Sequence, residues 1–355
     1  MLSFGVSFLP DATPTTMSAG DYFAGALEVC EFADRIGFGY VKMTEHYAHP
    51  YGGYCPSPLL FLSAVAARTR NIRLMTGGIM ASFHHPVQIA AHTAMLDVMS
   101  GGRLDTGFAR AWLPHEFDLF QVSMDESRAR FVETVDAVVD LWTRPGAEAA
   151  TPFFGYSGVD LLPGCVQRPH PPVWVAAVLS PQSFEWIARR GFGLLVTPGL
   201  RGFPALAEMV ALYRSTFAEA HAGSGARPRV ALSLPLIVAD SDAEAVSASD
   251  EYLGRYLEVW KSAGEMWNSR TSADYAGYTG VSWMLDNDSP AKMRERTAAV
   301  VGGPDSAVEQ ITRIRQTVDP DVLLWQIDTG AQPASRALTT LRLFADKVQP
   351  ALSLT

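Results

Sequence analysis

Several side chains that can move protons directly follow short apolar segments of the sequence. Glu45-His46-Tyr47 follows one such segment, and His84-His85-Pro86 follows another. A histidine can act as a general acid or base near neutral pH, so His46 is a candidate catalytic residue. The alternative is a packed histidine that is hydrogen-bonded to Glu45 or to a backbone carbonyl.

Two arginines and two serines form a candidate anion site. Arg110 ends a third apolar segment, Arg128 lies in a predicted helix, and Ser180 and Ser183 open another helix. Guanidinium groups bind phosphate oxygens with paired donors, and the free N–H groups at a helix N-terminus also receive anions. Each signal is weak alone, because surface arginines and capping serines are common. Together they predict a phosphate pocket.

Other chemistries have less support. His46, His49, His84, His85 and His115 could lie near one another, but their spacing is irregular and contains no HExxH-like pair, so no metal site is expected. The sequence also has no GxSxG elbow, no P-loop and no GxGxxG after a strand. Serine hydrolases and classical dinucleotide-binding folds are therefore disfavoured.

The elements that must position these side chains alternate between short apolar segments and helical patterns. This alternation is typical of βαβ units in a parallel sheet. The predicted strands are Phe4–Leu9, Tyr40–Thr44, Ile72–Ile79, Leu104–Ala109, Val173–Val178, Gly193–Thr197, Arg229–Ala239 and Val322–Asp328. The predicted helices between the early strands are Ala19–Ile36, Pro58–Thr69, Pro86–Met99 and, after the fourth strand, Ser127–Trp142.

Eight strands favour a closed (β/α)₈ TIM barrel, although an open doubly wound sheet has the same local pattern. In a parallel barrel the active site lies at the C-terminal ends of the strands, so the polar groups above would converge at one mouth. No composition break divides residues 1–355, which predicts a single domain.

Two segments interrupt the alternation. Residues 145–172 are rich in glycine and proline and are predicted to form a hairpin or irregular excursion. Residues 240–304 are long for a barrel connection and contain five aromatic residues from Trp260 to Trp283. This insertion is expected either to cover the barrel mouth as a lid or to form ordinary helices packed on the barrel.

Composition limits the classes of function. The 355 residues carry a net charge of −9 without a basic cluster, which argues against nucleic-acid binding. Cys30, Cys55 and Cys165 have no metal-ligand spacing and suit a reducing compartment. The N-terminus does not look like a signal peptide and no segment is long enough to span a membrane. A soluble cytoplasmic protein is expected.

Ordered motifs across several units resemble those of the bacterial luciferase family of flavin monooxygenases. They are Glu45-His46, His85-Pro86, Met99-Ser100-Gly101-Gly102-Arg103, Ser127-Arg128-Ala129, Glu185-Trp186 with Arg190-Gly191, and Gly302-Gly303-Pro304. The resemblance covers roughly the first 200 residues, and a late turn extends it. Motifs in this order are more specific than any one of them.

The resemblance implies a barrel enzyme that receives reduced FMN from a separate flavin reductase. Reaction with O₂ would give a flavin C4a-hydroperoxide, which hydroxylates or inserts oxygen into an apolar or aromatic small molecule. His46 is similar to the family's catalytic histidine, and Arg110, Arg128, Ser180 and Ser183 resemble its phosphate ligands. Gly77-Gly78 falls where the family has a non-prolyl cis peptide beneath the flavin ring.

Two positions depart from the family's luciferase pattern. Ala109 stands where the luciferase catalytic subunit has a reactive cysteine, and Leu179 replaces a carboxylate before the phosphate-binding serine. The missing thiol argues against light emission with an aldehyde. The missing carboxylate leaves room for a deazaflavin cofactor, so an F420-dependent hydride-transfer enzyme on the same barrel stays open. A third alternative is a non-catalytic flavin-binding partner subunit, as some luciferase relatives are, although His46 argues against it.

Two further expectations concern the substrate and the assembly. Phe8, Phe83, Phe108 and Trp112 could line the substrate pocket. Ala64, Ala66, Ala67, Ala90, Ala91 and Ala94 are small residues on the second and third helices. The family dimerises through this region, which favours a homodimer; the alternative is close packing of these helices on their own barrel.

Overall fold

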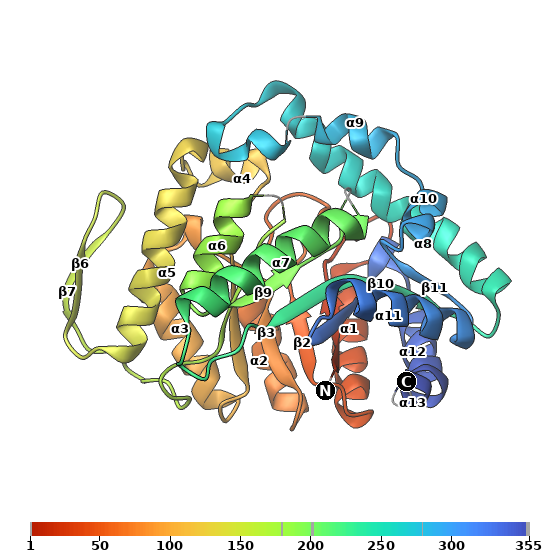
Figure 1. Ribbon diagram of the computed structural model, residues 1–355, viewed down its shortest axis with the longest axis horizontal. Helices are drawn as coiled ribbons and strands as arrows, with labels where there is room; N and C mark the ends of the chain where they lie inside the picture. The colour runs from red at the N-terminus through yellow and green to blue at the C-terminus, as the bar shows by residue number, and fades with distance from the viewer. Residues whose placement is uncertain (1, 179, 200–201, 279, 353–355) are drawn as a thin grey trace.

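The computed structural model describes residues 2–178, 180–199, 202–278 and 280–352. Within these residues eight parallel strands close a barrel in the order β1-β2-β3-β5-β8-β9-β10-β12, and β12 pairs with β1 (Figure 1). The strands are β1 Ser3–Phe8, β2 Tyr40–Met43, β3 Arg73–Thr76, β5 Leu104–Ala109, β8 Val173–Ala176, β9 Gly193–Val196, β10 Val230–Val238 and β12 Val322–Gln326. The closed barrel is thus confirmed over the open sheet.

The third predicted strand is broken in two. Residues 72–79 were expected to run as one strand, but β3 ends at Thr76 and a separate short strand, β4 Ile79–Met80, pairs with β5. The cis peptide Gly77-Gly78 lies between them. Apolar patterning does not reveal this break, because both pieces are buried.

Helices surround the barrel, and several begin where a proline occupies the first helical turn. Ser18 caps α1 by accepting a hydrogen bond from the Asp21 N–H group at 3.1 Å. The outer helices are α1 Ala19–Arg35, α2 Pro58–Arg68, α3 Pro86–Met99, α4 Pro114–Leu119, α5 Ser127–Thr143, α6 Pro181–Arg189, α7 Gly202–Ala220, α11 Pro304–Val318, α12 Ala334–Leu343 and α13 Gln349–Leu352.

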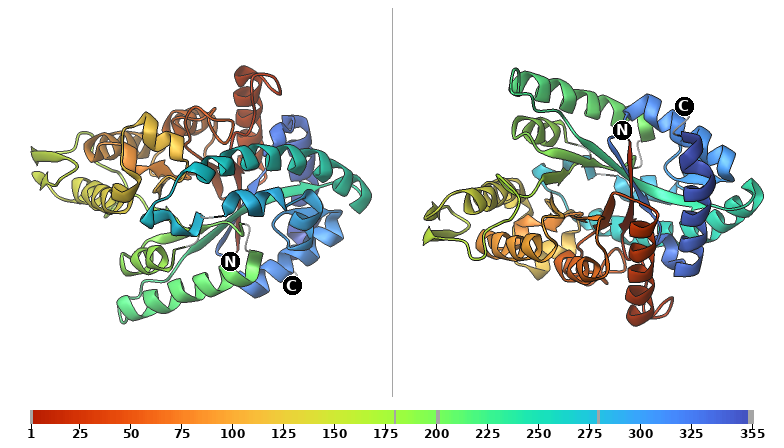
Figure 2. Two further views of the ribbon diagram at one scale, coloured as in Figure 1. Left: turned by 90° about the horizontal axis from the view of Figure 1, so that it is seen from above. Right: turned by 90° about the horizontal axis from the view of Figure 1, so that it is seen from below.

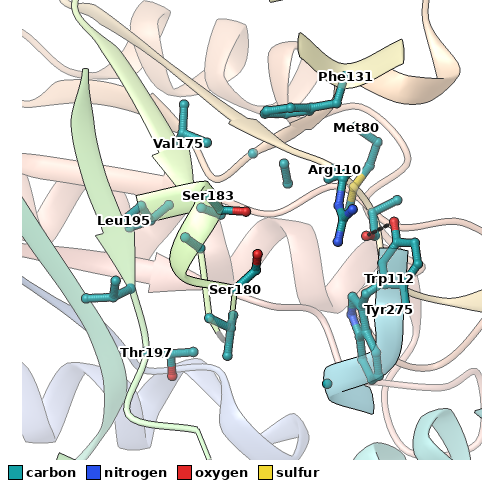
Figure 3. A pocket seen from close by; sticks show the side chains of 18 of the residues that line it. Met80, Arg110, Trp112, Phe131, Val175, Ser180, Ser183, Leu195, Thr197 and Tyr275 are labelled. Atoms are coloured by element: carbon teal, nitrogen blue, oxygen red, sulfur yellow. Dashed lines mark hydrogen bonds between the residues drawn. The ribbon is translucent and has the colours of Figure 1, made fainter. Parts of the chain in front are cut away.

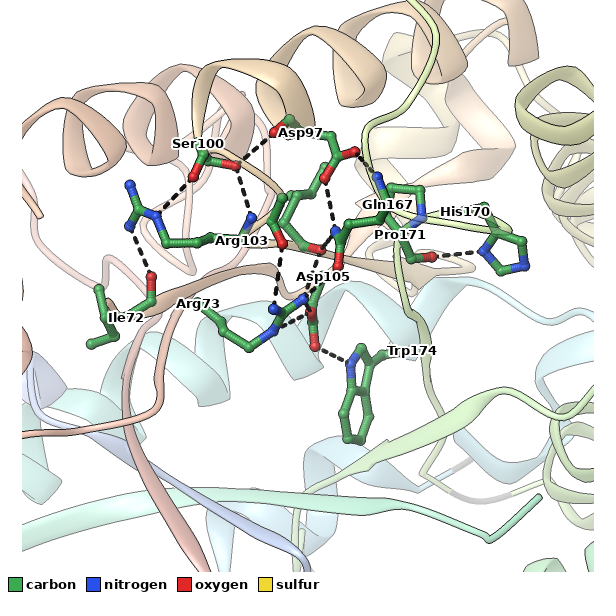
Figure 4. Close-up of polar contacts among 12 residues, drawn as sticks. Ile72, Arg73, Asp97, Ser100, Arg103, Asp105, Gln167, His170, Pro171 and Trp174 are labelled. Atoms are coloured by element: carbon green, nitrogen blue, oxygen red, sulfur yellow. Dashed lines mark hydrogen bonds and ion pairs between the residues drawn. The ribbon is translucent and has the colours of Figure 1, made fainter. Parts of the chain in front are cut away.

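A polar network lies at the N-terminal end of the barrel (Figure 4). Asp105 is fully buried, pairs with Arg73 and accepts a hydrogen bond from Trp174 Nε1 at 2.8 Å. Gln167, from the loop before β8, donates to the Leu104 carbonyl at 2.6 Å and to Asp97 at 2.8 Å. Arg103 donates to the Ala66, Thr69 and Ile72 carbonyls. These buried groups are paired with one another, so the network fixes how β3, β5, β8 and the loop before β8 pack at this end of the barrel.

The late segment crosses the opposite end, over the C-terminal ends of the strands (Figures 1 and 2). It comprises α8 Asp242–Glu265, η3 Met266–Ser269, η4 Ala273–Tyr278, α9 Val281–Asp286, α10 Pro290–Glu295 and β11 Val300–Gly302. The sequence did not predict β11, a short strand that extends the sheet beside β10. Residues of α8 and η4 line the cavity beneath them.

The glycine- and proline-rich excursion contains the expected hairpin, β6 Ala147–Ala150 and β7 Gly155–Val159. It projects away from the barrel at the left of Figure 1. Among the described residues, no helix is both long enough and apolar enough to span a membrane.

Candidate active site

A cavity of about 770 Å³ lies at the barrel mouth. It is lined by residues that follow several strands, by the first turns of α5 and α6, and by α8 and η4. Figure 3 shows Arg110, Trp112 and Tyr275 on one side, with Ser180 and Ser183 facing them across the cavity. The expected convergence holds for part of the strand-end residues: His46, Arg110, Ser180 and Ser183 line the cavity, whereas Glu45, His84 and His85 do not.

His46 lies at the cavity wall and is held by a buried carboxylate. Its Nδ1 lies 3.0 Å from Glu116 Oε1, and the same oxygen accepts the Tyr47 backbone N–H group at 2.9 Å. Glu116, in α4, is fully buried, and its Oε2 has no hydrogen-bond partner among the described residues. A carboxylate at Nδ1 favours the tautomer with the proton on that nitrogen, leaving Nε2 as the ring nitrogen available to a substrate.

Glu45, the neighbour of His46, has a different role. Its Oε1 lies 2.6 Å from His84 Nε2 and accepts a hydrogen bond from the Tyr47 hydroxyl at 2.8 Å. The alternative for His46 was a packed histidine bonded to Glu45 or to a backbone carbonyl; the buried His46 is bonded through Nδ1 to Glu116 instead. Among the described residues, no three or more His, Cys, Asp or Glu side chains form a group that could hold a metal.

The four predicted anion ligands meet at one end of the cavity, here called the arginine end. Arg128 donates to the Ser180 hydroxyl at 3.1 Å and to the Ser183 hydroxyl at 3.3 Å. Arg110 Nη1 is buried and makes no hydrogen bond to any described residue. Ser180 is the N-cap of α6, so the helix adds the positive end of its dipole. This donor set fits a phosphate group.

An acidic residue of the late segment also contacts the arginine end. Asp274, in η4, lies 3.6 Å from both Arg110 Nη1 and Arg128 Nε and accepts the Arg128 backbone N–H group at 3.2 Å. The adjacent Tyr275 packs its ring 4.1 Å from the Arg110 guanidinium carbon and donates to the Ala111 carbonyl at 3.0 Å. Burial, with Arg110 close by, lowers the pKa of Arg128. The late segment thus holds both arginines.

Two glycines leave room for a flat ring on the cavity floor. A Cβ atom at Gly77 would lie 2.2 Å from Lys42 Cε, and one at Gly78 would lie 2.6 Å from the Phe108 backbone carbon. Side chains at these positions would therefore displace their neighbours. The cis peptide that the family resemblance implies is present here. A bare backbone floor beside a phosphate cradle fits FMN.

Aromatic side chains form the other wall of the cavity. Trp112 stacks on Tyr278 with ring centroids 5.7 Å apart and meets Tyr51 edge-on at 5.3 Å. Tyr51 also packs edge-on against the His46 ring at 5.1 Å. Tyr256 and Trp260 of α8 complete this wall. It suits an apolar or aromatic molecule beside His46.

Three of the four phenylalanine and tryptophan positions predicted to line the pocket do not do so. Phe8 packs edge-on against Phe61 of α2, and Phe108 lies beside Trp142 of α5, so both point outward from their strands. The alternation along each strand was assigned the wrong phase: Ser7 and Ala109 face inward instead. Phe83 stacks on Phe120 at 4.7 Å, within the cluster beneath α4. Trp112 alone of the four lines the cavity.

Ala109, which stands at the position of the luciferase cysteine, does line the cavity. Leu179, the other departure, lies outside the described residues. Sequence reasoning missed several residues that the structure brings to the site, namely Lys42, Tyr51, Glu116, Tyr256 and Asp274. One signal was available: Lys42 is a charged residue in the middle of a buried strand.

The sequence profile of the luciferase-like monooxygenase family matches residues 2–319. The chain is 28% identical over 339 residues to the oxygenase component of the flavin-dependent trigonelline monooxygenase of Acinetobacter baylyi, covering 92% of this chain and 89% of that protein.

Two solved structures resemble the whole chain. Monooxygenase RslO1 from Streptomyces bottropensis has a TM-score of 0.83 and 36% identity over 99% of both chains. The FMN complex of the oxygenating constituent of 3,6-diketocamphane monooxygenase, from Pseudomonas putida, has a TM-score of 0.80 and 20% identity, covering 99% of this chain and 98% of that chain. The latter likeness shows the fold alone.

Proposed function

The chain belongs to the luciferase-like monooxygenase family and is a flavin-dependent monooxygenase, and from that premise we propose that it is the oxygenase component of a two-component system. A separate flavin reductase supplies it with reduced FMN, and O₂ is the oxidant. The observation that supports this most directly is a single cavity containing a phosphate cradle, a glycine floor and His46.

The arginine end holds the FMN phosphate in this proposal. Arg110 and Arg128 supply charged donors, Ser180 and Ser183 supply hydroxyl groups, and α6 directs its N-terminus to the same place. Gly77 and Gly78 accept the ring against bare backbone. When bound, reduced FMN supplies the electrons that activate dioxygen: one oxygen atom enters the substrate and the other leaves as water.

His46 is the catalytic residue in this proposal. Glu116 holds the Nδ1 proton, so Nε2 can accept a proton from the substrate or return one. The aromatic wall places the substrate beside the imidazole and excludes water from it. The substrate class that suits this wall is an apolar or aromatic small molecule, which the enzyme hydroxylates or into which it inserts oxygen.

The test combines the purified protein with FMN, a flavin reductase, NADH and a panel of aromatic substrates. We expect substrate-dependent oxygen uptake, with one atom of isotopically labelled dioxygen appearing in the product. Product formed under strict anaerobiosis would contradict the proposal. Reduction of F420 by an alcohol without oxygen uptake would assign the F420-dependent alternative instead.

We also propose that the protein is a homodimer joined through α2 and α3. Ala90 and Ala94 are fully buried, so part of the small-residue stripe packs on its own barrel. The neighbouring Leu60, Met95 and Met99 are 76%, 53% and 56% exposed, however, and give these two helices an apolar outer surface. Light scattering should give twice the chain mass, and Met95→Lys should give a monomer; a monomeric wild type contradicts the dimer.

A further inference from the structure

Lys42 projects into the barrel from β2 and lies on the floor of the cavity. It is 7% exposed, and its aliphatic stem passes directly beneath Gly77. In the sheet, Lys42 is in register with Ser7 of β1, and Ser7 is in register with Gln326 of β12. Lys42, Ser7 and Gln326 therefore form one polar row, here called the floor row.

The ammonium group of Lys42 has a neutral partner. Nζ donates to Ser7 Oγ at 3.0 Å, and Ser233 Oγ donates to the same oxygen at 3.1 Å. Within the described residues no carboxylate forms an ion pair with Lys42, whereas Arg73, Arg110 and Arg128 each have one. Burial lowers the pKa of Lys42 to about 8, against the opposing effect of Asp328. The side chain is thus mostly a cation at neutral pH without a paired anion.

Gln326 is a second unsatisfied donor in the floor row. It is 7% exposed and lines the cavity, yet its Nε2 has no hydrogen-bond partner among the described residues. A buried amide donor without a partner is costly, as is a buried ammonium group without a counter-charge. Both groups would be satisfied by one anionic ligand that also carries a hydrogen-bond acceptor.

Reduced FMN has these properties and oxidised FMN does not. The reduced isoalloxazine loses its N1 proton near neutral pH, and the negative charge spreads to the adjacent carbonyl oxygen. The oxidised ring is neutral. Resting on the proposed function, we propose that Lys42, assisted by Gln326, supplies the positive charge and donors that make this site selective for the anionic reduced flavin over the oxidised flavin.

The experiment compares anaerobic binding of oxidised and reduced FMN to the wild type and to Lys42→Met. We expect the wild type to bind reduced FMN more tightly, and Lys42→Met to lower that preference about tenfold, through weaker binding of the reduced form. The same tenfold change lowers the midpoint potential of bound FMN by about 30 mV. Gln326→Leu should lower the preference by a smaller factor. Arg128→Gln is the control, because loss of a phosphate contact weakens both forms equally.

The outcomes separate the two proposals. A wild type that binds neither form of FMN contradicts the proposed function. A Lys42→Met protein with the wild-type preference for reduced FMN overturns the role of Lys42 alone.

A spectroscopic readout on the wild type does not depend on the folding of any variant. Lys42 Nζ donates to the Ser7 hydroxyl, which also accepts from Ser233, and Gln326 lies on the far side of Ser7 in the floor row. Asp328, beyond β12, is the charged group that acts on Lys42. Asp328 is bonded to Tyr22, and burial raises its pKa. Bound reduced FMN should keep the anionic absorption spectrum at mildly acidic pH, where free reduced FMN becomes neutral. A bound flavin that titrates like the free one overturns the inference.

Discussion

The arginine end of the cavity and the part around His46 and Glu116, here called the histidine end, hold their charges in different ways. Arg110 and Arg128 are partly exposed and contact Asp274, which comes from a segment more than 140 residues away. His46 and Glu116 are almost completely buried, and both belong to the first half of the barrel. The partly exposed arginines lie within reach of another anion in the cavity, whereas the His46–Glu116 pair is enclosed. In the proposed function, FMN binding therefore falls to the partly exposed arginine end and proton transfer to the enclosed histidine end.

Replacement of His46 by alanine tests the histidine end and should have the largest effect. We expect kcat to fall about 10²- to 10³-fold, since a positioned acid or base contributes on that order. The affinity for FMN should stay within about twofold, because the phosphate contacts remain. Steady-state oxygen uptake and anaerobic FMN titration measure the two quantities. An unchanged rate would favour the non-catalytic partner subunit.

The double variant Arg110→Gln/Arg128→Gln tests the arginine end. Charge-assisted hydrogen bonds contribute about 1.5–3 kcal/mol each, so the affinity for both forms of FMN should fall at least about 10²-fold. The value of kcat at saturating FMN should change only a few-fold. Arg190→Gln, which removes the exposed pair with Asp136, is the matched control. A similar loss of FMN affinity in Arg190→Gln would mean that the effect is not specific to Arg110 and Arg128. It would then not support a phosphate site at the arginine end.

Lys42→Met tests whether the floor row carries an unpaired charge. The pKa of Lys42 is about 8 in the folded protein and 10.5 when unperturbed, so the unfolded state binds more protons between these values. Wild-type stability should therefore rise relative to the variant by about 3 kcal/mol as pH increases through this window. Chemical denaturation at several pH values measures it, with the exposed Lys347→Met as control. A pH-independent difference would show that Lys42 is paired.

Glu116→Gln tests how the histidine end is positioned. The amide keeps the shape but cannot hold the Nδ1 proton of His46 in the same way, so kcat should fall about tenfold or more. The KM for the substrate should change little, and Glu116→Asp should recover part of the rate. Equal loss of kcat and thermal stability, with no recovery by aspartate, would indicate a packing role only.

Asp274→Asn should have the smallest effect and act in the opposite direction. Partly exposed ion pairs contribute about 0.2–1 kcal/mol, so removal of the competing carboxylate should tighten FMN binding up to about fivefold. Asp125→Asn is the control, because Asp125 holds the same segment through Ser272 without contacting the arginines. Weaker FMN binding in Asp274→Asn would show that the carboxylate organises the arginines for the phosphate.

The sequence predicted most of the fold because barrel strands are short, apolar and regularly spaced. Strand and helix ends agree with the structure within one or two residues for most of the elements up to α5. Periodicity could not distinguish a closed barrel from an open sheet. It also could not show the break at Gly77-Gly78, because the residues on both sides are buried. Inward and outward faces were confused for Phe8 and Phe108. The large apolar side chains of these strands pack outward against the helices, whereas inward positions such as Ser7 and Ala109 are polar or small.

The candidate site was predicted where a residue follows a strand and missed where contacts are long-range. His46, Arg110 and Ser180 each stand at a strand end or a helix start, which a sequence pattern can show. Glu116 reaches His46 across 70 positions, and Asp274 reaches the Arg110 side chain across 164. Such pairs depend on how separate segments pack at the barrel mouth, and single-chain periodicity carries no information on that packing.

The short segment Ala273–Tyr278 contacts both the proposed FMN-phosphate site and the proposed substrate pocket, so it can couple the binding of the two. Asp274 holds the arginines, and Tyr278, four residues later, stacks on Trp112 in the aromatic wall. A phosphate that replaces Asp274 at the arginines would therefore act on the same six residues that contribute Tyr278 to the aromatic wall. We expect a compulsory order of loading, with flavin first and substrate second, so that an oxidisable molecule enters only a barrel already equipped to oxidise it.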